Sequence, residues 1–176
     1  YKVIKEVPPE DELPAVESNL TFVGLVGMMD PPRETVKESI KTCREAGIRP
    51  IMITGDSLST ATAIAKEIGI IQEGTGVIEG KELNKLSDEQ LIKEVSKYSV
   101  YARVQPEHKV RIVKAWQANN KVVAMTGDGV NDAPAIKLAH VGIGMGKTGT
   151  EVTKSVADVI LVDDSFSTIV DAVGEG

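Results

Sequence analysis

The chain has 176 residues, and its 41% hydrophobic and 26% charged content is that of a globular domain large enough to bury one core. Aromatic residues make up only 3% and the net charge is −6, which argues against an aromatic stacking platform or a basic face for nucleic acid. No apolar run reaches the roughly 18 residues that span a bilayer. Cys43 is the only cysteine, so no internal disulfide can form, and its helical setting predicts a buried structural thiol.

Strand-like and helix-like patterns alternate along the chain. Residues 1–19 are rich in proline and acidic residues and are predicted to form a linker or edge segment. Apolar spacing then predicts, in chain order, a strand at 20–27, a helix at 33–47, a strand at 49–53, a helix at 57–69 and a looser part at 71–85. A polar helix at 87–97, a strand at 99–103, a helix opening at Pro106, apolar segments at 122–126, 135–139 and 141–145, a helix at 151–156, a strand at 159–162 and a final helix follow.

This alternation predicts the fold class. Strands that alternate with helices of about 10–15 residues indicate an α/β domain with a Rossmann-like, mainly parallel sheet covered by helices on both faces. In such sheets, ligands bind beyond the carboxyl ends of the strands. The polar residues that follow each apolar strand are therefore the candidates for a functional site.

The first such strand end is Thr54-Gly55-Asp56, which follows the apolar residues 51–53 and precedes a helix. A hydroxyl and free backbone N–H groups at this place favour an anion. Taken alone, the same residues could, together with Ser57, do no more than cap the helix.

The second strand end carries Asp128, Asn131 and Asp132 within the segment 126–132, spaced by two glycines. Two carboxylates crowded at one strand end repel each other unless a cation shares them, and hard oxygen ligands with room for water suit Mg²⁺. A turn capped by an Asx side chain would explain the segment without any ligand. However, a turn does not require a second Thr-Gly-Asp after a second apolar strand, and this recurrence favours a functional site.

Two cations lie between these acidic elements in the sequence. Arg103 ends a predicted strand, and Lys109 lies in the first turn of the helix that opens at Pro106. A lysine acts as a point charge on a phosphate. As a lone residue, Lys109 would be read as a surface lysine, and its functional interpretation depends on its position between the two Thr-Gly-Asp elements.

A threonine strand end, a lysine at a later helix start and an Asp-x-x-x-Asp strand end resemble the last three motifs of the haloacid dehalogenase superfamily. Within it, the sequence resembles the P-type cation-transporting ATPases, and especially the calcium pumps, from about Leu20 onward. The resemblance covers the half of the phosphorylation domain that follows the nucleotide-binding insertion. It is carried by DPPRETV (30–36), MITGD (52–56), ARVQPEHK (102–109), MTGDGVNDAPAIK (125–137) and ADVILVDDSFSTIV (157–170).

The resemblance implies a role for each candidate residue. Thr54, Gly55, Lys109 and Asn131 would hold the phosphoryl group, and Asp128 would bind Mg²⁺ with Asp132 supporting the metal and water network. Asp56 and Arg103 would face the bound ATP, and residues 30–33 would form a hinge. Residues 1–19 would come from the nucleotide-binding side, and residues 20–176 would be a partial phosphorylation domain.

The aspartate that the family phosphorylates, in an Asp-Lys-Thr-Gly-Thr motif, is absent from this sequence. Lys147 to Thr150 imitate the end of that motif, but Gly146 precedes them and cannot accept a phosphoryl group. Asp163 and Asp164 end an apolar strand, yet they come too late in the chain to be the nucleophile. By the resemblance, the central strand of the sheet is therefore missing. Its two neighbours must pair with each other, admit another segment or leave backbone groups unsatisfied, and the chain is expected to be a fragment.

The expected function is that of a partial cytoplasmic phosphorylation domain of an ATP-driven cation pump, with calcium the favoured ion. Its partners would be the nucleotide-binding, actuator and transmembrane domains of the parent, which alone would contact the membrane; no nucleic acid is expected. This chain alone, itself soluble, is expected to be inactive. The alternatives are a free-standing phosphatase of the same superfamily and a degenerate, non-catalytic regulatory module. Gly144, Gly146 and Gly149 also outline a dinucleotide fingerprint, but too late in the chain for a first βαβ unit.

Overall fold

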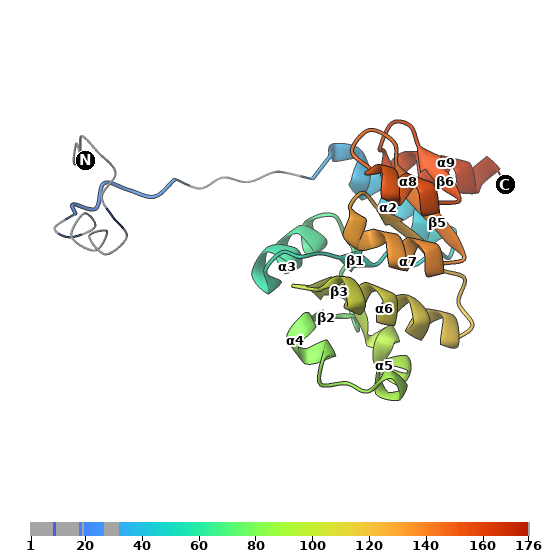
Figure 1. Ribbon diagram of the computed structural model, residues 1–176, viewed down its shortest axis with the longest axis horizontal. Coiled ribbons are helices and arrows are strands. Elements are labelled where there is room, and N and C mark those ends of the chain that lie inside the picture. Colours follow the sequence, from blue (N-terminus) through green and yellow to red (C-terminus); the bar gives the residue numbers. More distant parts are fainter. Residues whose placement is uncertain (1–8, 10–17, 19, 27–31, 176) are drawn as a thin grey trace. The chain divides into compact units, whose positions relative to one another are not determined.

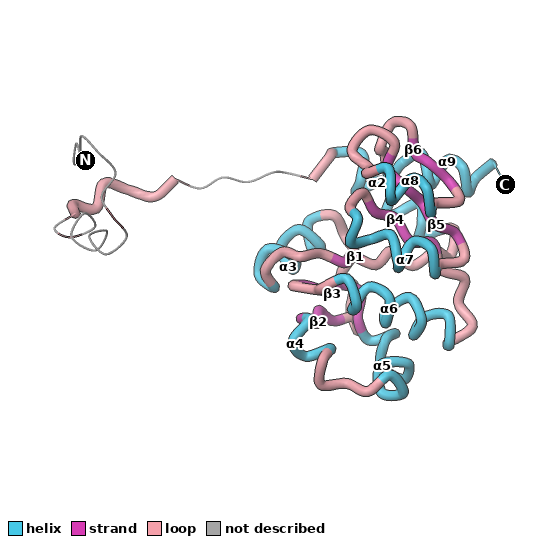
Figure 2. The backbone as a smooth tube through the Cα atoms, viewed as in Figure 1, coloured by secondary structure: helices cyan, strands magenta, loops and turns pink. Residues whose placement is uncertain are grey.

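A computed structural model describes residues 9, 18, 20–26 and 32–175, and it divides the chain into two compact units, 1–31 and 32–176. The sequence places the domain boundary twelve residues earlier, at 19/20, and that boundary stays a prediction. Within the described residues, no helix has the length and apolar character needed to cross a membrane. The second unit holds all the regular secondary structure of the described chain (Figures 1 and 2).

The first half of this unit is a three-stranded parallel sheet in the order β1-β3-β2 with helices on both faces. Alternate residues of β3 face opposite sides, so Val100 and Ala102 pack against one set of helices and Tyr101 against the other. Its elements are α2 (Glu34–Glu45), β1 (Met52–Ile53), α3 (Leu58–Glu67), β2 (Gly76–Glu79), α4 (Gly80–Leu83), α5 (Asp88–Glu94), η2 (Val95–Lys97), β3 (Tyr98–Ala102) and α6 (Pro106–Ala118).

The second half is another three-stranded parallel sheet, in the order β4-β5-β6. Its β5 contains glycines at which the neighbouring helices come close: a Cβ on Gly142 would lie 2.7 Å from the carbonyl oxygen of Ile136 on α7. The elements are β4 (Ala124–Gly127), η3 (Val130–Asp132), α7 (Ala133–Leu138), β5 (Val141–Met145), α8 (Glu151–Val156), β6 (Val159–Leu161) and α9 (Phe166–Glu175).

The two sheets meet through helices and a shared core. In Figure 1 the first sheet lies in the lower half of the second unit and the second sheet in the upper half, with α6 and α7 where they meet. Ile53 of β1 packs against the cluster that contains Met125 of β4 and Val113 of α6. Among the described residues β1 and β4 are not paired with each other, so each ends its own sheet on one side. Of the three outcomes expected for the missing strand, neither direct pairing of its neighbours nor an inserted strand is present among the described residues.

The fold class and most elements agree with the sequence-based expectations, and two differences have a physical cause. The segment 20–26 forms no strand, and its large apolar side chains are exposed, from 66% for Leu20 to 94% for Val26. A strand exists only where a neighbour supplies hydrogen bonds, and residues 20–26 have no such neighbour in the described part of the chain. Conversely, the looser part at 71–85 contains β2, which forms because β3 pairs with it.

Candidate functional site

The Thr54–Asp56 loop is fixed to the end of the neighbouring strand β3. The Thr54 N–H donates to the Tyr101 carbonyl (2.9 Å), and the Val104 N–H donates to the Thr54 carbonyl (3.2 Å). The Arg103 N–H donates in turn to the carbonyl of Asp56 (3.0 Å). Two residues that are 47 positions apart in the chain, Asp56 and Arg103, are thus brought together, and their contact with a nucleotide stays a prediction.

The side chains of this loop do not cap α3. The cap is Ser57, whose hydroxyl accepts from the Thr60 N–H (3.2 Å). The Thr54 hydroxyl instead donates to Asp56 Oδ2 (2.9 Å) and accepts from the Asp56 N–H (3.1 Å). Gly55 and Asp56 are exposed. The loop is therefore a closed local arrangement in which the Thr54 hydroxyl is already paired, and the N–H of the exposed Gly55 is the donor that it leaves available to an anion.

The second loop is organised by Asp132, a residue that is only 7% exposed as a whole. One carboxylate oxygen forms an ion pair with Lys109 Nζ, and the other accepts from the Gly129 N–H (3.2 Å). The same side chain fills the space where a Cβ on Gly127 would stand, 2.5 Å from its own Cβ. Glycine at position 127 is thus required for Asp132 to turn inward.

Lys109 reaches this loop because α6 begins with a well-formed cap. The Gln105 N–H donates to His108 Nδ1 (2.9 Å), and His108 Nε2 lies 2.7 Å from Asn84 Oδ1. Since Nδ1 accepts, the proton of the neutral ring is on Nε2, which donates to Asn84. His108 is 2% exposed, and its burial lowers its pKa below the ordinary value. The neutral imidazole is part of the turn that carries Lys109.

The charge distribution bears directly on the expected magnesium site. Lys109 neutralises the carboxylate of Asp132. The protein itself therefore supplies part of the positive charge that the crowded carboxylates of Asp128 and Asp132 require. Asp128 is exposed, and within the described residues its carboxylate makes no hydrogen bond or ion pair. No group of three His, Cys, Asp or Glu side chains lies together in the described part of the chain. One free carboxylate beside a paired one fits Mg²⁺, which keeps several waters and takes its other ligands from phosphate, rather than a metal caged by protein.

The predicted residues therefore fall into two sets on neighbouring strand ends. Thr54, Asp56 and Arg103 form the first set around β1 and β3. Lys109 and Asp132 form the second, together with the exposed side chains of Asp128 and Asn131. Hydrophobic packing brings the strands β1 and β4 toward one core, but no hydrogen bond joins the two sets within the described chain.

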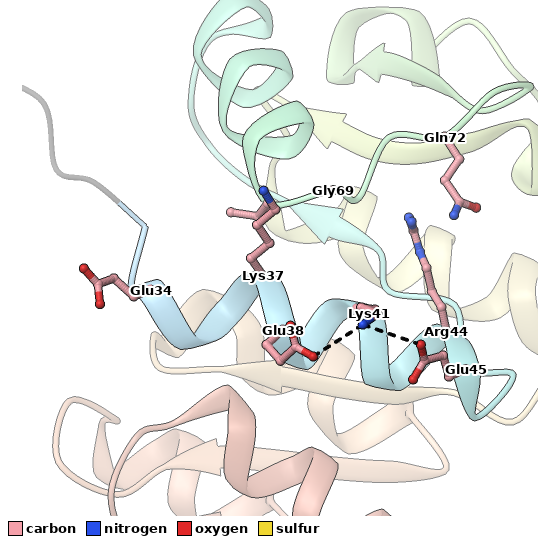
Figure 3. Close-up of a pocket in the computed structure, with 9 residues that line it drawn as sticks. Glu34, Lys37, Glu38, Lys41, Arg44, Glu45, Gly69 and Gln72 are labelled. Atoms are coloured by element: carbon pink, nitrogen blue, oxygen red, sulfur yellow. Dashed lines mark ion pairs between the residues drawn. The ribbon is translucent and has the colours of Figure 1, made fainter.

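Two open grooves lie on the surface of the second unit. One, of about 720 Å³, runs along α3 from Ser57 to Lys66 and is bordered by Arg103, so it adjoins the first set. The other, of about 510 Å³, lies between α2 and the chain around Gly69 (Figure 3). Its lining is mostly charged, and Lys41 pairs there with Glu38 and Glu45 at 3.7 and 3.9 Å. The second groove contains none of the predicted site residues.

Sequence reasoning missed the residues that hold the second loop from behind. Thr150 and Thr153 contact the backbone carbonyls of Asp128 and Gly129. The signal was present as Thr-x-x-Thr at the N-cap of α8, but Thr150 was considered only as part of the likeness of residues 147–150 to the end of the phosphorylation motif, and Thr153 was not considered. The glycines of the dinucleotide-like pattern have a packing reason, because a Cβ on Gly146 would lie 2.6 Å from the Leu161 carbonyl oxygen.

Comparison with known proteins assigns the class. The family model for haloacid dehalogenase-like hydrolases matches residues 2–140, and the chain belongs to this family. The resemblance that the motifs predicted is thereby confirmed.

Its relatives are calcium-transporting ATPases. The chain is 57% identical over 161 residues to Calcium-transporting ATPase 1 of Bacillus cereus, a match that covers 92% of this chain and 18% of that protein. It is 52% identical to the Calcium-transporting ATPase of Bacillus subtilis, over 100% of this chain and 20% of the relative. The human Calcium-transporting ATPase type 2C member 1 is 50% identical, over 89% and 17%. The chain thus spans about a fifth of the length of these relatives.

A solved structure shares the fold. It is the catalytic domain of the CPx-ATPase CopB-B, from work on conformational changes upon nucleotide binding. The TM-score is 0.62 at 30% identity, and the match covers 82% of this chain and 46% of the other. The split into two three-stranded sheets is therefore a variant of an established α/β architecture.

Proposed function

We propose that this chain is the phosphate- and Mg²⁺-binding part of the phosphorylation domain of an ATP-driven calcium pump. The observation that carries the proposal is the pairing of Lys109 with Asp132 beside the free carboxylate of Asp128. Phosphoryl transfer requires positioning and charge neutralisation more than covalent help. One cation and one available carboxylate at the end of β4, with a hydroxyl-bearing loop at the end of β1, whose Ile53 packs against the same core, suit that requirement.

The chain's own residues divide the task. Lys109 is oriented by its ion pair and would neutralise a phosphoryl oxygen. In this structure the Thr54 hydroxyl donates to Asp56, and with phosphate bound it would donate to a phosphoryl oxygen instead. The Gly55 N–H and the side-chain amide of Asn131 would be further donors. Asp128 would hold Mg²⁺, which when bound neutralises negative charge on the phosphate. Arg103 and Asp56 would face the nucleotide.

The nucleophile would come from another part of the parent protein. The apolar strand that ends in Asp-Lys-Thr-Gly-Thr would lie between β1 and β4, whose free edges face no strand among the described residues. The parent would then be an integral membrane protein with this domain in the cytoplasm, joined to nucleotide-binding, actuator and transmembrane domains. Calcium is proposed as the transported ion because the relatives are named calcium-transporting ATPases. The residues that select the ion would lie in the membrane-spanning part of the parent.

A titration of the isotope-labelled chain with Mg²⁺ and with inorganic phosphate, followed by NMR, tests the proposal. We expect shifts at residues 54–56 and 126–132, and we expect Asp128→Asn to abolish the response to Mg²⁺. The matched control is Asp171→Asn, which removes an exposed carboxylate on α9. If neither residues 54–56 nor residues 126–132 show chemical-shift changes, the non-catalytic module would be favoured instead.

A second measurement separates the proposal from a free-standing phosphatase. The chain is incubated with ATP labelled in the γ-phosphate and, in parallel, with a phosphate monoester. We expect no stable label and no turnover, because this sequence lacks the Asp-Lys-Thr-Gly-Thr motif whose aspartate the family phosphorylates. Acid-resistant labelling, or phosphatase activity that Asp128→Ala abolishes, would contradict us.

A further inference from the structure

The backbone of the Asp128 loop is held by the start of α8, through contacts separate from the ion pair with Lys109. The Thr150 N–H donates to the carbonyl of Asp128 (2.9 Å). The hydroxyl of Thr153 lies 3.0 Å from the carbonyl oxygen of Gly129 and 3.3 Å from that of Asp128. Consecutive carbonyls of the loop that presents the Asp128 carboxylate therefore point at one short segment of chain.

The proton positions in this cluster follow from the groups present. Carbonyl oxygens only accept, so the single hydroxyl proton of Thr153 goes to the pair of carbonyls. The Thr150 hydroxyl, 2.8 Å away, must then donate to Thr153 Oγ1, while it accepts from the Thr153 N–H (3.2 Å) as the helix cap. Each hydroxyl thus donates its one proton and accepts one hydrogen bond, and these bonds are directed at the cap or at the loop.

Capping alone does not account for this arrangement. A cap needs only the Thr150 hydroxyl, and a valine at position 153 would fill the same volume. Thr153 is 0% exposed, and burying a hydroxyl is unfavourable unless it is hydrogen-bonded. Its acceptors lie 24 and 25 positions away in the chain, on the residue that carries the free carboxylate and on its neighbour. The buried hydroxyl therefore serves the loop more than the helix.

We propose that Thr153, assisted by Thr150, is a positioning residue that fixes the Asp128 loop in the conformation that binds Mg²⁺. This inference rests on the proposed function. With Lys109 and Asp132 holding the C-terminal side of the loop and Thr153 its carbonyls, only the Asp128 carboxylate is free to turn outward. Loss of the hydroxyl leaves each carbonyl with one backbone donor, the Thr150 N–H for Asp128 and the Asp132 N–H for Gly129, so the loop is held less firmly and more of its ordering falls at the moment of binding.

Variants of Thr153 in the same chain provide the test, with Mg²⁺ alone as the probe. Thr153→Val keeps the shape and removes the hydroxyl, and we expect it to weaken Mg²⁺ binding about tenfold. Thr153→Ser keeps the hydroxyl and should bind within about twofold of the wild type. Ser39→Ala, which removes a buried hydroxyl on α2, is the control and should not change Mg²⁺ affinity.

Amide hydrogen exchange supplies a readout that does not need the metal. In Thr153→Val the Thr150 N–H, which donates to Asp128, should exchange faster, while amides of α3 keep their protection. If Thr153→Val does not fold, Thr153→Ala carries the same test with a smaller side chain.

The outcomes separate the two proposals. If wild type and Thr153→Val bind Mg²⁺ equally and exchange at Thr150 is unchanged, the positioning role is wrong and the proposed function stands. If the wild-type chain does not bind Mg²⁺ at all, the proposed function fails and the positioning inference is overturned with it. Weakened binding in Thr153→Val with rescue by Thr153→Ser supports both.

Discussion

At the scale of single residues, Lys109 changes the meaning of the acidic loop. Its ammonium pairs with Asp132, and both side chains are mostly buried, 18% and 10% exposed. An ion pair in such a place is expensive to break from one side, because the remaining charge has no partner. Lys109 is thus a structural counter-ion as well as a candidate phosphate ligand.

Replacement of Lys109 by methionine should destabilise the chain by about 3 kcal/mol, since Asp132 would keep only the Gly129 N–H. Urea unfolding monitored by circular dichroism measures this. Lys85→Met is the matched control: the side chains of its ion pair with Glu82 are 69% and 44% exposed, and the expected change is much smaller. If the two variants lower the free energy of unfolding equally, the ion pair of Lys109 does not stabilise the fold more than the exposed pair of Lys85 does.

His108 gives the molecule a pH dependence of known sign. Burial lowers its pKa in the folded state, so between the ordinary pKa near 6.5 and the lowered value the unfolded chain binds a proton that the folded chain resists. The contribution of His108 to stability is therefore complete above pH of about 6.5 and is lost as the pH falls through this window.

We expect the free energy of unfolding to fall more steeply below pH of about 6.5 in the wild type than in His108→Gln. Urea unfolding at closely spaced pH values measures the slope. If the free energy of unfolding of His108→Gln falls with pH as steeply as that of the wild type, groups other than His108 cause the pH dependence.

At the scale of elements, the loop that follows β5 is fixed by Asp164. This residue has a φ of +56° and accepts from the N–H groups of Lys147 (2.9 Å) and Thr148 (2.7 Å). These bonds, the Lys147 bond above all, lower its pKa to about 2. The Arg33 guanidinium donates to the Asp164 carbonyl (3.0 Å), so the start of the second unit is tied to the same point.

Asp164→Asn tolerates the left-handed backbone but cannot accept through both side-chain atoms. We expect a lower melting temperature at pH 7 and faster exchange of the Lys147 and Thr148 amides. The difference between variant and wild type should shrink as the pH falls from about 4 toward about 2, where the native carboxylate itself takes up a proton. A difference that is constant over this range would argue against the carboxylate as its source.

At the scale of the whole molecule, the division into two sheets is the central feature. β1 and β4 are edge strands of their two sheets, and hydrophobic side chains from both strands pack in one core. Unpaired strand edges are templates for a further strand. By the proposed function, that strand is the one that carries the phosphorylated aspartate.

A peptide with five apolar β-formers followed by Asp-Lys-Thr-Gly-Thr should therefore bind the chain by strand addition. We expect slower amide exchange along residues 51–53 and 123–126 and tighter Mg²⁺ binding when the peptide is present. A peptide with proline in the middle of its apolar part, which removes a ladder hydrogen bond, is the control. Binding that protects only the outer strands β2 or β6 would disprove this placement.

Local patterns in the sequence were sufficient for most elements and for the chemistry of the candidate loops. The helix 151–156 has the same bounds in the sequence-based expectation and in the structure, because Thr150 supplies a cap and the apolar spacing begins at once. Both Thr-Gly-Asp elements follow strands, as expected, since an apolar run that ends in glycine and polar residues has few other solutions. The strand β2 was not predicted from the sequence, because its two apolar residues, Val77 and Ile78, are too few to show the alternation that is typical of a strand.

The sequence by itself determined the α/β class, the family and the residue types of the candidate site, because these follow from short-range periodicity and from motifs contiguous in the chain. Only the tertiary structure decided which groups meet. It paired Lys109 with Asp132 and left Asp128 free, and it placed the Thr153 hydroxyl beneath that loop. Hydrogen bonds and ion pairs between residues some 20 positions apart depend on how helices pack on sheets, and no local pattern encodes that packing.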